Sequence, residues 1–191
     1  SVPAKSIKEL IALAKAKPGE LNYASTGVGT AQHLATELFK TMTGVSIVHI
    51  PYKGLPATIT ALLGNEVQMV ITDAGLLAPH VKLGNLRALA VTSAEPSVLA
   101  PGLPTVAASG VPDFEASSVT GIWAPAKTPG AIINRLNQEI VRFLKTPEAK
   151  ERFLSNGVEI IGSSADDFAA AIKSDMARTG KGIKDGGIKV D

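Results

Sequence analysis

Residues 21–34 constrain the fold of this chain more than any other stretch. Their sequence, LNYASTGVGTAQHL, begins with an apolar run typical of a buried strand, passes through a polar glycine-rich segment and enters an amphipathic helix pattern. Glycines let the main chain approach a ligand closely, because they adopt backbone angles that other residues resist. The first N–H groups of a helix lack partners inside the helix and carry a partial positive charge. This order of strand, glycine turn and helix therefore predicts a site for a carboxylate or phosphate.

Hydroxyl groups and a histidine add to this predicted anion site. The candidate ligand-binding residues of the stretch are Ser25, Thr26, Gly29, Thr30 and His33. A Walker loop requires Lys before Ser or Thr, and the dinucleotide fingerprint requires a small residue where this chain has Gln32, so neither motif is present. Two alternatives to this reading stay open. In the first, the stretch is not an anion site but a plain strand-to-helix turn with Thr30 as N-cap. In the second, His33 does not contact a ligand but turns into the fold.

The same strand, turn and helix pattern recurs along the first half of the chain. Strands are predicted at 45–50, 67–72 and 86–91, and helices at 56–63 and 76–83. Strands that alternate with helices indicate a parallel sheet, and ligands bind beyond the carboxyl ends of its strands. The turns at 25–30, 51–55 and 72–75 are therefore expected to share one edge. Asp73 follows a strand at this edge, where it either contacts a ligand or caps the next helix.

Proline-rich sequence separates this part from the rest. The prediction is a ligand-binding α/β lobe at 1–94, a connection at 95–115 and a C-terminal segment at 116–191. Outside the repeated pattern, a first helix is predicted to begin at the capping-box pattern of Ser6 and Glu9 and to end at Lys17-Pro18-Gly19. Further helices are predicted at 129–144, 147–155 and from Ser164 to about Lys184, and strands at 116–124 and 158–161. The helix at 129–144 carries an apolar stripe formed by Ile132, Ile133, Leu136, Ile140 and Leu144.

Composition and spacing argue against several classes of protein. The net charge of +2 over 191 residues is too small to indicate binding to nucleic acid, and there is no Cys. The three histidines show no metal-ligand spacing, and no apolar run reaches membrane-spanning length. No cofactor motif, nucleophile elbow or nucleophile–base pair is evident. His49 and His80 are interpreted as structural, and Glu37 as part of a solvated helix face.

Four segments, taken together, resemble a known family. They are YASTGVGTAQHLATELF, VHIPYKG, VQMVITDAGLLAPHVKLGNLRALAVTS and LPTVAASGVPDFEASSVTGIWAPAKTP. In this order they resemble the Bug-type receptors of the TctC family, which are the extracytoplasmic solute-binding proteins of tripartite tricarboxylate transporters. The resemblance covers essentially the whole chain.

The resemblance implies a two-lobed α/β fold of the periplasmic-binding-protein type II kind, with a parallel-rich sheet flanked by helices. It implies a periplasmic receptor without catalysis that closes on a small carboxylate, such as a dicarboxylate, an amino acid or an aromatic acid, and delivers it to permease subunits. One carboxylate is gripped by two facing loops, and residues 25–30 match one of them. The facing loop is expected in an N-terminal first lobe that, like a signal peptide, is absent from this sequence. The tail is expected to cross back to that lobe, and its helices to be open to self-association without it.

Some residues depart from the family pattern. Leu55 stands where relatives usually carry a small residue, Gly75 where a proline is common, and Asp73 where Asn is common. These departures concern the far end of the ligand more than the grip on its carboxylate. The alternative hypothesis is a small α/β enzyme that acts on an anionic substrate, with Thr30, His33 and Asp73 as polar groups of its site.

Overall fold

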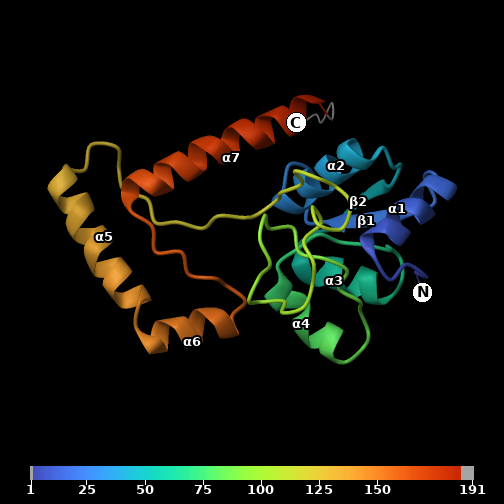
Figure 1. Ribbon diagram of the computed structural model, residues 1–191, viewed down its shortest axis with the longest axis horizontal. Helices are drawn as coiled ribbons and strands as arrows, with labels where there is room; N and C mark the ends of the chain where they lie inside the picture. The colour runs from blue at the N-terminus through green and yellow to red at the C-terminus, as the bar shows by residue number, and fades with distance from the viewer. Residues whose placement is uncertain (1, 186–191) are drawn as a thin grey trace. The chain divides into compact units, whose positions relative to one another are not determined.

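The computed structural model describes residues 2–185 (Figure 1). It divides into two compact units, one formed by residues 2–117 with 179–185 and the other by residues 118–178. Contacts thus place residues 95–115 in the same unit as 2–94, while the predicted return of the tail to another lobe stays a prediction.

The first unit is built on one parallel β-α-β arrangement. Strand β1 (Asn22–Ser25) pairs in parallel with β2 (Val48–Pro51), and α2 (Ala31–Thr43) connects them. Their register runs from Asn22 opposite Val48 to Ser25 opposite Pro51. Gly44 ends α2 in the left-handed conformation that glycine favours, as its position after the apolar pattern predicts. The predicted α/β class with parallel pairing is therefore confirmed.

Several predicted strands are shorter than expected or absent. The strand expected at 67–72 forms a single parallel bridge from Met69 to Tyr23, and the one at 86–91 forms a single bridge from Val91 to Thr105. Within the described residues, 116–124 and 158–161 form no strand. β-branched sequence favours a strand only where a neighbouring strand completes the hydrogen-bond ladder. The segment at 67–72 bonds to the backbone of β1 through Gln68 and Met69, and this pairing is too short to form a full strand.

The predicted helices of this unit form close to their expected bounds. Helix α1 spans Ile7–Ala16, with Ser6 Oγ accepting from the Glu9 N–H at 3.2 Å as the capping pattern predicts. Helices α3 and α4 span Leu55–Leu63 and Ala74–Lys82. Local signals such as caps and glycines lie within one turn of the helices that they end, which makes these bounds predictable.

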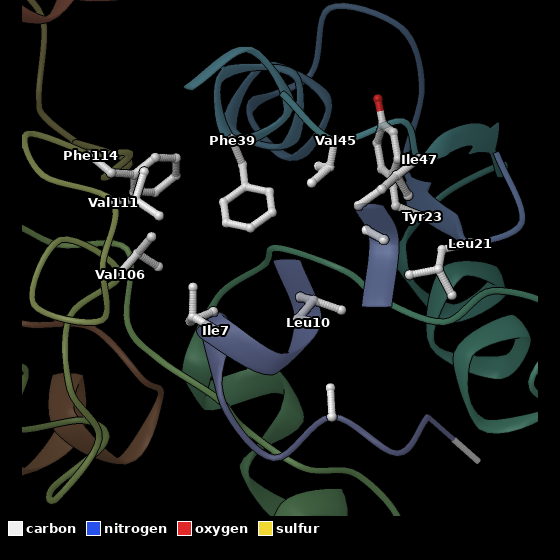
Figure 2. Close-up of a cluster of buried hydrophobic side chains, with 12 residues drawn as sticks. Ile7, Leu10, Leu21, Tyr23, Phe39, Val45, Ile47, Val106, Val111 and Phe114 are labelled. Atoms are coloured by element: carbon white, nitrogen blue, oxygen red, sulfur yellow. The ribbon is translucent and has the colours of Figure 1, made fainter. Parts of the chain in front are cut away.

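The core of this unit lies between α1, α2 and the two strands (Figure 2). It draws on α1, on residues beside both strands and on the proline-rich segment, and its buried members include Leu10, Tyr23, Phe39, Ile47, Val106 and Phe114. The rings of Phe39 and Phe114 meet edge to face with centroids 6.0 Å apart. The segment predicted as a connection therefore supplies side chains to the core.

The second unit contains three helices at the positions that the sequence predicts. They are α5 (Gly130–Leu144), α6 (Pro147–Ser155) and most of α7 (Ala165–Asp185). Thr146 caps α6, and Ser164 Oγ accepts from the Asp167 N–H at 3.1 Å at the start of α7. No residue of α5 is buried. On its predicted stripe, Ile132 is 51% exposed and Leu136 is 48% exposed, while the other three residues are partly buried. No helix in residues 2–185 is long and apolar enough to cross a membrane.

Candidate functional site

The segment between β1 and α2, residues 25–30, forms a loop that is tied to itself by its own hydroxyl groups. We call it the glycine loop. Ser25 Oγ accepts from the Gly27 N–H at 3.1 Å, and Thr30 Oγ1 donates to the Gly27 carbonyl at 2.8 Å. Gly29 has a φ of 78°, in the left-handed region where a side chain would be strained. The loop is therefore already shaped by bonds among its own residues.

The start of α2 leaves N–H donors open above this loop. Thr30 occupies the N-cap position, but its side chain accepts no capping bond, and its hydroxyl donates to the Gly27 carbonyl. The N–H groups of Ala31, Gln32 and His33 have no hydrogen-bond acceptor among the residues described. The Thr26 hydroxyl likewise has no partner in that part of the chain. Donors of this kind at a helix N-terminus are suited to an anion.

The structure shows a structural task for Ser25 and Thr30. Ser25 is fully buried, and the Thr30 hydroxyl donates its proton inside the loop. Both side chains bond to Gly27 and so hold the middle of the loop. Their predicted contact with a ligand stays a prediction, as does that of Thr26 and Gly29.

Gln32 connects the glycine loop to a distant turn, and sequence reasoning missed it. Its Oε1 accepts from the Thr26 N–H at 2.9 Å, and its Nε2 donates to Thr72 Oγ1 at 3.0 Å. The Tyr52 N–H donates to the Ser25 carbonyl at 2.9 Å. These bonds bring the turns after β1, after β2 and after residue 71 to one edge, which confirms the predicted shared edge.

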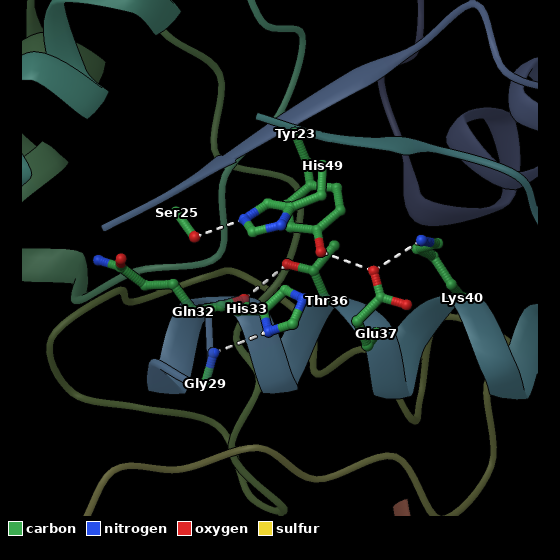
Figure 3. A network of polar contacts seen from close by, with 9 residues as sticks. All are labelled: Tyr23, Ser25, Gly29, Gln32, His33, Thr36, Glu37, Lys40 and His49. Carbon is green, nitrogen blue, oxygen red and sulfur yellow. Dashed lines mark hydrogen bonds and ion pairs between the residues drawn. The ribbon is translucent and has the colours of Figure 1, made fainter. Parts of the chain in front are cut away.

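Two stacked histidines lie beside the glycine loop (Figure 3). His33 is only 7% exposed, and its Nδ1 accepts from the Gly29 N–H at 3.1 Å. Its ring stacks on His49 with centroids 4.3 Å apart, and His49 Nε2 lies 2.6 Å from Ser25 Oγ. Burial lowers the pKa of both imidazoles below the ordinary 6.5, so both rings are neutral near neutral pH. His33 thus turns into the fold, the second of the two alternatives.

The Ser25–His49 contact is a nucleophile–base pair of the kind that the sequence did not reveal. Its geometry does not make it catalytic. Ser25 has no exposed surface, and its oxygen also accepts from the Gly27 N–H. A serine nucleophile must reach its substrate, and this one is enclosed by the loop that it shapes.

A half-buried charged group extends the network along α2. Tyr23 Oη donates to Glu37 Oε1 at 2.6 Å, and Lys40 Nζ bonds the same oxygen at 2.6 Å. Although burial acts to raise the pKa of Glu37, the bonds from Lys40 and Tyr23 hold it below its ordinary value. The expectation that Glu37 belongs to a solvated face is therefore wrong, because its side chain turns toward β1.

Asp73 lies at the N-cap position of α4 and is exposed. Its side chain makes no capping bond, so the capping alternative is not realised in this structure. Its neighbour Thr72 binds Gln32, which places Asp73 at the same edge as the glycine loop. A role toward a ligand stays a prediction. In the described residues, His, Asp and Glu form no group that is able to hold a metal ion.

The first unit is thus a parallel α/β unit in which the glycine loop and the uncapped start of α2 lie at one edge of the strands. Comparison with known proteins shows the family to which such a chain belongs. The model of the tripartite tricarboxylate transporter family receptor, TctC, matches residues 1–188. The chain belongs to this family, as its four motifs indicate.

Individual relatives extend beyond this chain. It is 36% identical over 185 residues to Protein BugT of Bordetella pertussis, covering 97% of this chain and 57% of that protein. The solved R. palustris protein Rpa4515 with adipate is 36% identical with a TM-score of 0.87, and the match covers 98% of this chain and 63% of that one. The periplasmic binding protein BugD is 29% identical with a TM-score of 0.79, over 99% and 64%. The chain thus spans less than two thirds of each.

The Glu37 network predicts a specific pH dependence of stability. Because the folded-state pKa of Glu37 is depressed, its contribution is complete above the ordinary 4.5 and is lost as the pH falls through the folded value. We expect Glu37→Gln to lower the free energy of unfolding near neutral pH by about 1–3 kcal/mol and to flatten its acid dependence. Urea denaturation as a function of pH measures both.

Glu20→Gln is the matched control, because Glu20 pairs with Lys17 on the open surface. It should change the free energy of unfolding by less than about 1 kcal/mol. Equal effects of the two variants would contradict the assignment of Glu37 to a stabilising network.

Proposed function

We propose that this chain is the ligand-binding lobe of a periplasmic receptor that captures a small carboxylate for a tripartite tricarboxylate-type transporter. The observation that carries the proposal is the glycine loop beside the uncapped start of α2. There the N–H groups of Ala31, Gln32 and His33 have no acceptor in the described chain. Membership of the TctC family supports the same assignment.

The energetics of such a site favour an anion. A hydrogen bond to a charged group contributes about 1.5–3 kcal/mol, and the helix dipole adds about 0.3–1 kcal/mol. The loop is held by Ser25, Thr30 and Gln32 before any ligand arrives, so little conformational freedom is lost on binding. In this proposal a ligand carboxylate accepts from the open main-chain N–H groups and from the Thr26 hydroxyl.

The proposed ligand is a small carboxylate and the proposed role is binding without catalysis. The relative Rpa4515, which was solved with adipate, supports a ligand of this class. The enclosed hydroxyl of Ser25 offers no accessible nucleophile, which disfavours the alternative of an enzyme acting on an anionic substrate. Permease subunits of the transporter are the proposed partners of the complete receptor.

We further propose that a first lobe outside this chain supplies the facing loop and covers the apolar stripe of α5. Relatives are long enough to contain such a lobe, because the match to this chain covers only 57% of BugT. The half-exposed Ile132 and Leu136 are large apolar side chains that gain stability when covered.

Light scattering tests this coverage. Without a first lobe, the 191-residue chain should self-associate through the stripe as its concentration rises, since large apolar patches promote association. Leu136→Asp should suppress this, whereas Gln138→Asp, which adds the same charge off the stripe, should not. A stable monomer at all concentrations would contradict the proposal.

Thr26→Val tests the proposed grip on the carboxylate. The substitution keeps the side-chain shape and removes a hydroxyl that has no partner in residues 2–185. In the complete receptor, calorimetric titration should show adipate affinity about tenfold lower, the equivalent of about 1.4 kcal/mol. Thr60→Val on α3 is the matched control, because Thr60 is exposed and its hydroxyl, like that of Thr26, forms no bond to the described residues. Unchanged affinity of Thr26→Val would remove Thr26 from the site.

Asp73→Asn tests the far end of the ligand. A carboxylate there repels a second ligand carboxylate and attracts an ammonium group. We expect the substitution to shift the ratio of affinities for 6-aminohexanoate and adipate toward adipate by about tenfold. These ligands share one chain length and differ in the distal group. If the ratio keeps its wild-type value, Asp73 takes no part in ligand selection.

A further inference from the structure

His33 holds the second half of the glycine loop against α2. The first half is bound through Thr26 to Gln32 and through Gly27 to Ser25. In the second half, the Gly29 N–H donates to His33 Nδ1 at 3.1 Å, one turn into the helix. A histidine at this third helical position does the work of the glutamate in a capping box, which reaches back to an N–H near the cap.

The ring that makes this bond is fixed from several sides (Figure 3). It stacks on His49 at 4.3 Å and lies 6.4 Å from the Tyr23 ring, with interplanar angles of 24° and 14°. His49 in turn lies 2.6 Å from Ser25 Oγ. The charged groups that act on His33 are Glu37 and Lys40 of its own helix, and they form an ion pair with each other.

We propose that His33 is the positioning residue of the glycine loop: its neutral ring, with no proton on Nδ1, holds Gly29 against α2, and a proton taken up at Nδ1 releases that half of the loop. The bond requires a lone pair on Nδ1, because the partner is an N–H donor. A proton on Nδ1 sets donor against donor, and the new charge faces His49 across the stacked rings. The importance of this support for ligand capture rests on the proposed function, whereas the support itself does not.

Burial sets the direction of the pH response. It lowers the pKa of His33 below 6.5, with Glu37 acting in the opposite direction and Lys40 in the same one. The ring is therefore neutral in the folded chain when an exposed histidine already takes up protons. The contribution of His33 to stability is complete above 6.5 and is lost as the pH falls through the folded-state pKa.

Nuclear magnetic resonance on the 191-residue chain tests the proposal without any ligand. Imidazole nitrogen shifts should show His33 with its proton on Nε2 near neutral pH, since Nδ1 accepts from Gly29. Between about pH 7.5 and about pH 4.5, the Gly29 amide should lose about fivefold to tenfold of its exchange protection, corrected for intrinsic exchange. The midpoint should coincide with the titration of His33. A proton on Nδ1 near neutral pH, or Gly29 protection that does not follow His33, would overturn the proposal.

Two substitutions separate the bond from mere packing. His33→Asn places an amide oxygen near the position of Nδ1 and does not titrate, so Gly29 should stay protected across the pH range. His33→Leu fills space without an acceptor, so protection should be low at every pH. His80→Asn, in α4, is the control and should leave the Gly29 profile as in the wild type. If the Gly29 amide is as well protected in His33→Leu as in His33→Asn, or is protected in neither variant, the acceptor role of His33 is refuted. If the Leu variant does not fold, the pH profile of the Asn variant still decides.

Adipate titration of the complete receptor near neutral pH adds the link to ligand capture. His33→Leu should bind at least about tenfold more weakly than His33→Asn, because neither side chain carries a charge and they differ in the acceptor. If the wild type itself does not bind adipate, carboxylate capture as proposed fails for this ligand, while the amide-exchange result still decides the role of His33. If both variants bind equally, the loop support is irrelevant to capture.

Discussion

The parallel pairing of β1 and β2 is the constraint on which the candidate site depends. Parallel strands require a crossover, and here the crossover is α2, so the N-terminus of α2 must lie at the carboxyl ends of both strands. The same register places His49 of β2 opposite Tyr23 of β1. One pairing thus brings the open helix N–H groups, the glycine loop and the stacked rings to one edge.

Buried polar groups make this edge specific. Burying a polar atom without a partner costs about 1–3 kcal/mol, so each enclosed group favours the arrangement that satisfies it. Ser25 and Glu37 bond to His49 and Tyr23 of the two strands, and His33 bonds to Gly29 one turn before it. Gln32 bonds to Thr72, which lies 40 residues further along the chain. The loop is therefore held by bonds to the fold, while the N–H groups of Ala31, Gln32 and His33 have no acceptor in the described chain.

The helices of the second unit are capped and covered to different extents. Side chains cap α6 and α7, whereas α5 has no side-chain cap, buries none of its residues and leaves Ile132 and Leu136 half exposed. An amphipathic helix gains most of its stability from covering its apolar face. The starts of α6 and α7 are thus specified locally, while the apolar face of α5 is only partly covered within the described residues.

The sequence by itself determined the features that depend on near neighbours. Caps such as Ser6 and Ser164 and the terminating Gly44 lie within a turn of the groups they serve, so helix bounds, the glycine loop and the parallel order of elements were predictable. Tertiary structure alone decided the rest. The segments at 67–72 and 86–91 form single bridges and not full strands. The length of a ladder depends on a neighbouring strand from a distant part of the sequence, which the local pattern does not specify. The tasks of Ser25 and Glu37 depend on His49 and Tyr23, which lie 24 and 14 residues away. Only the folded chain brings such groups within hydrogen-bonding distance.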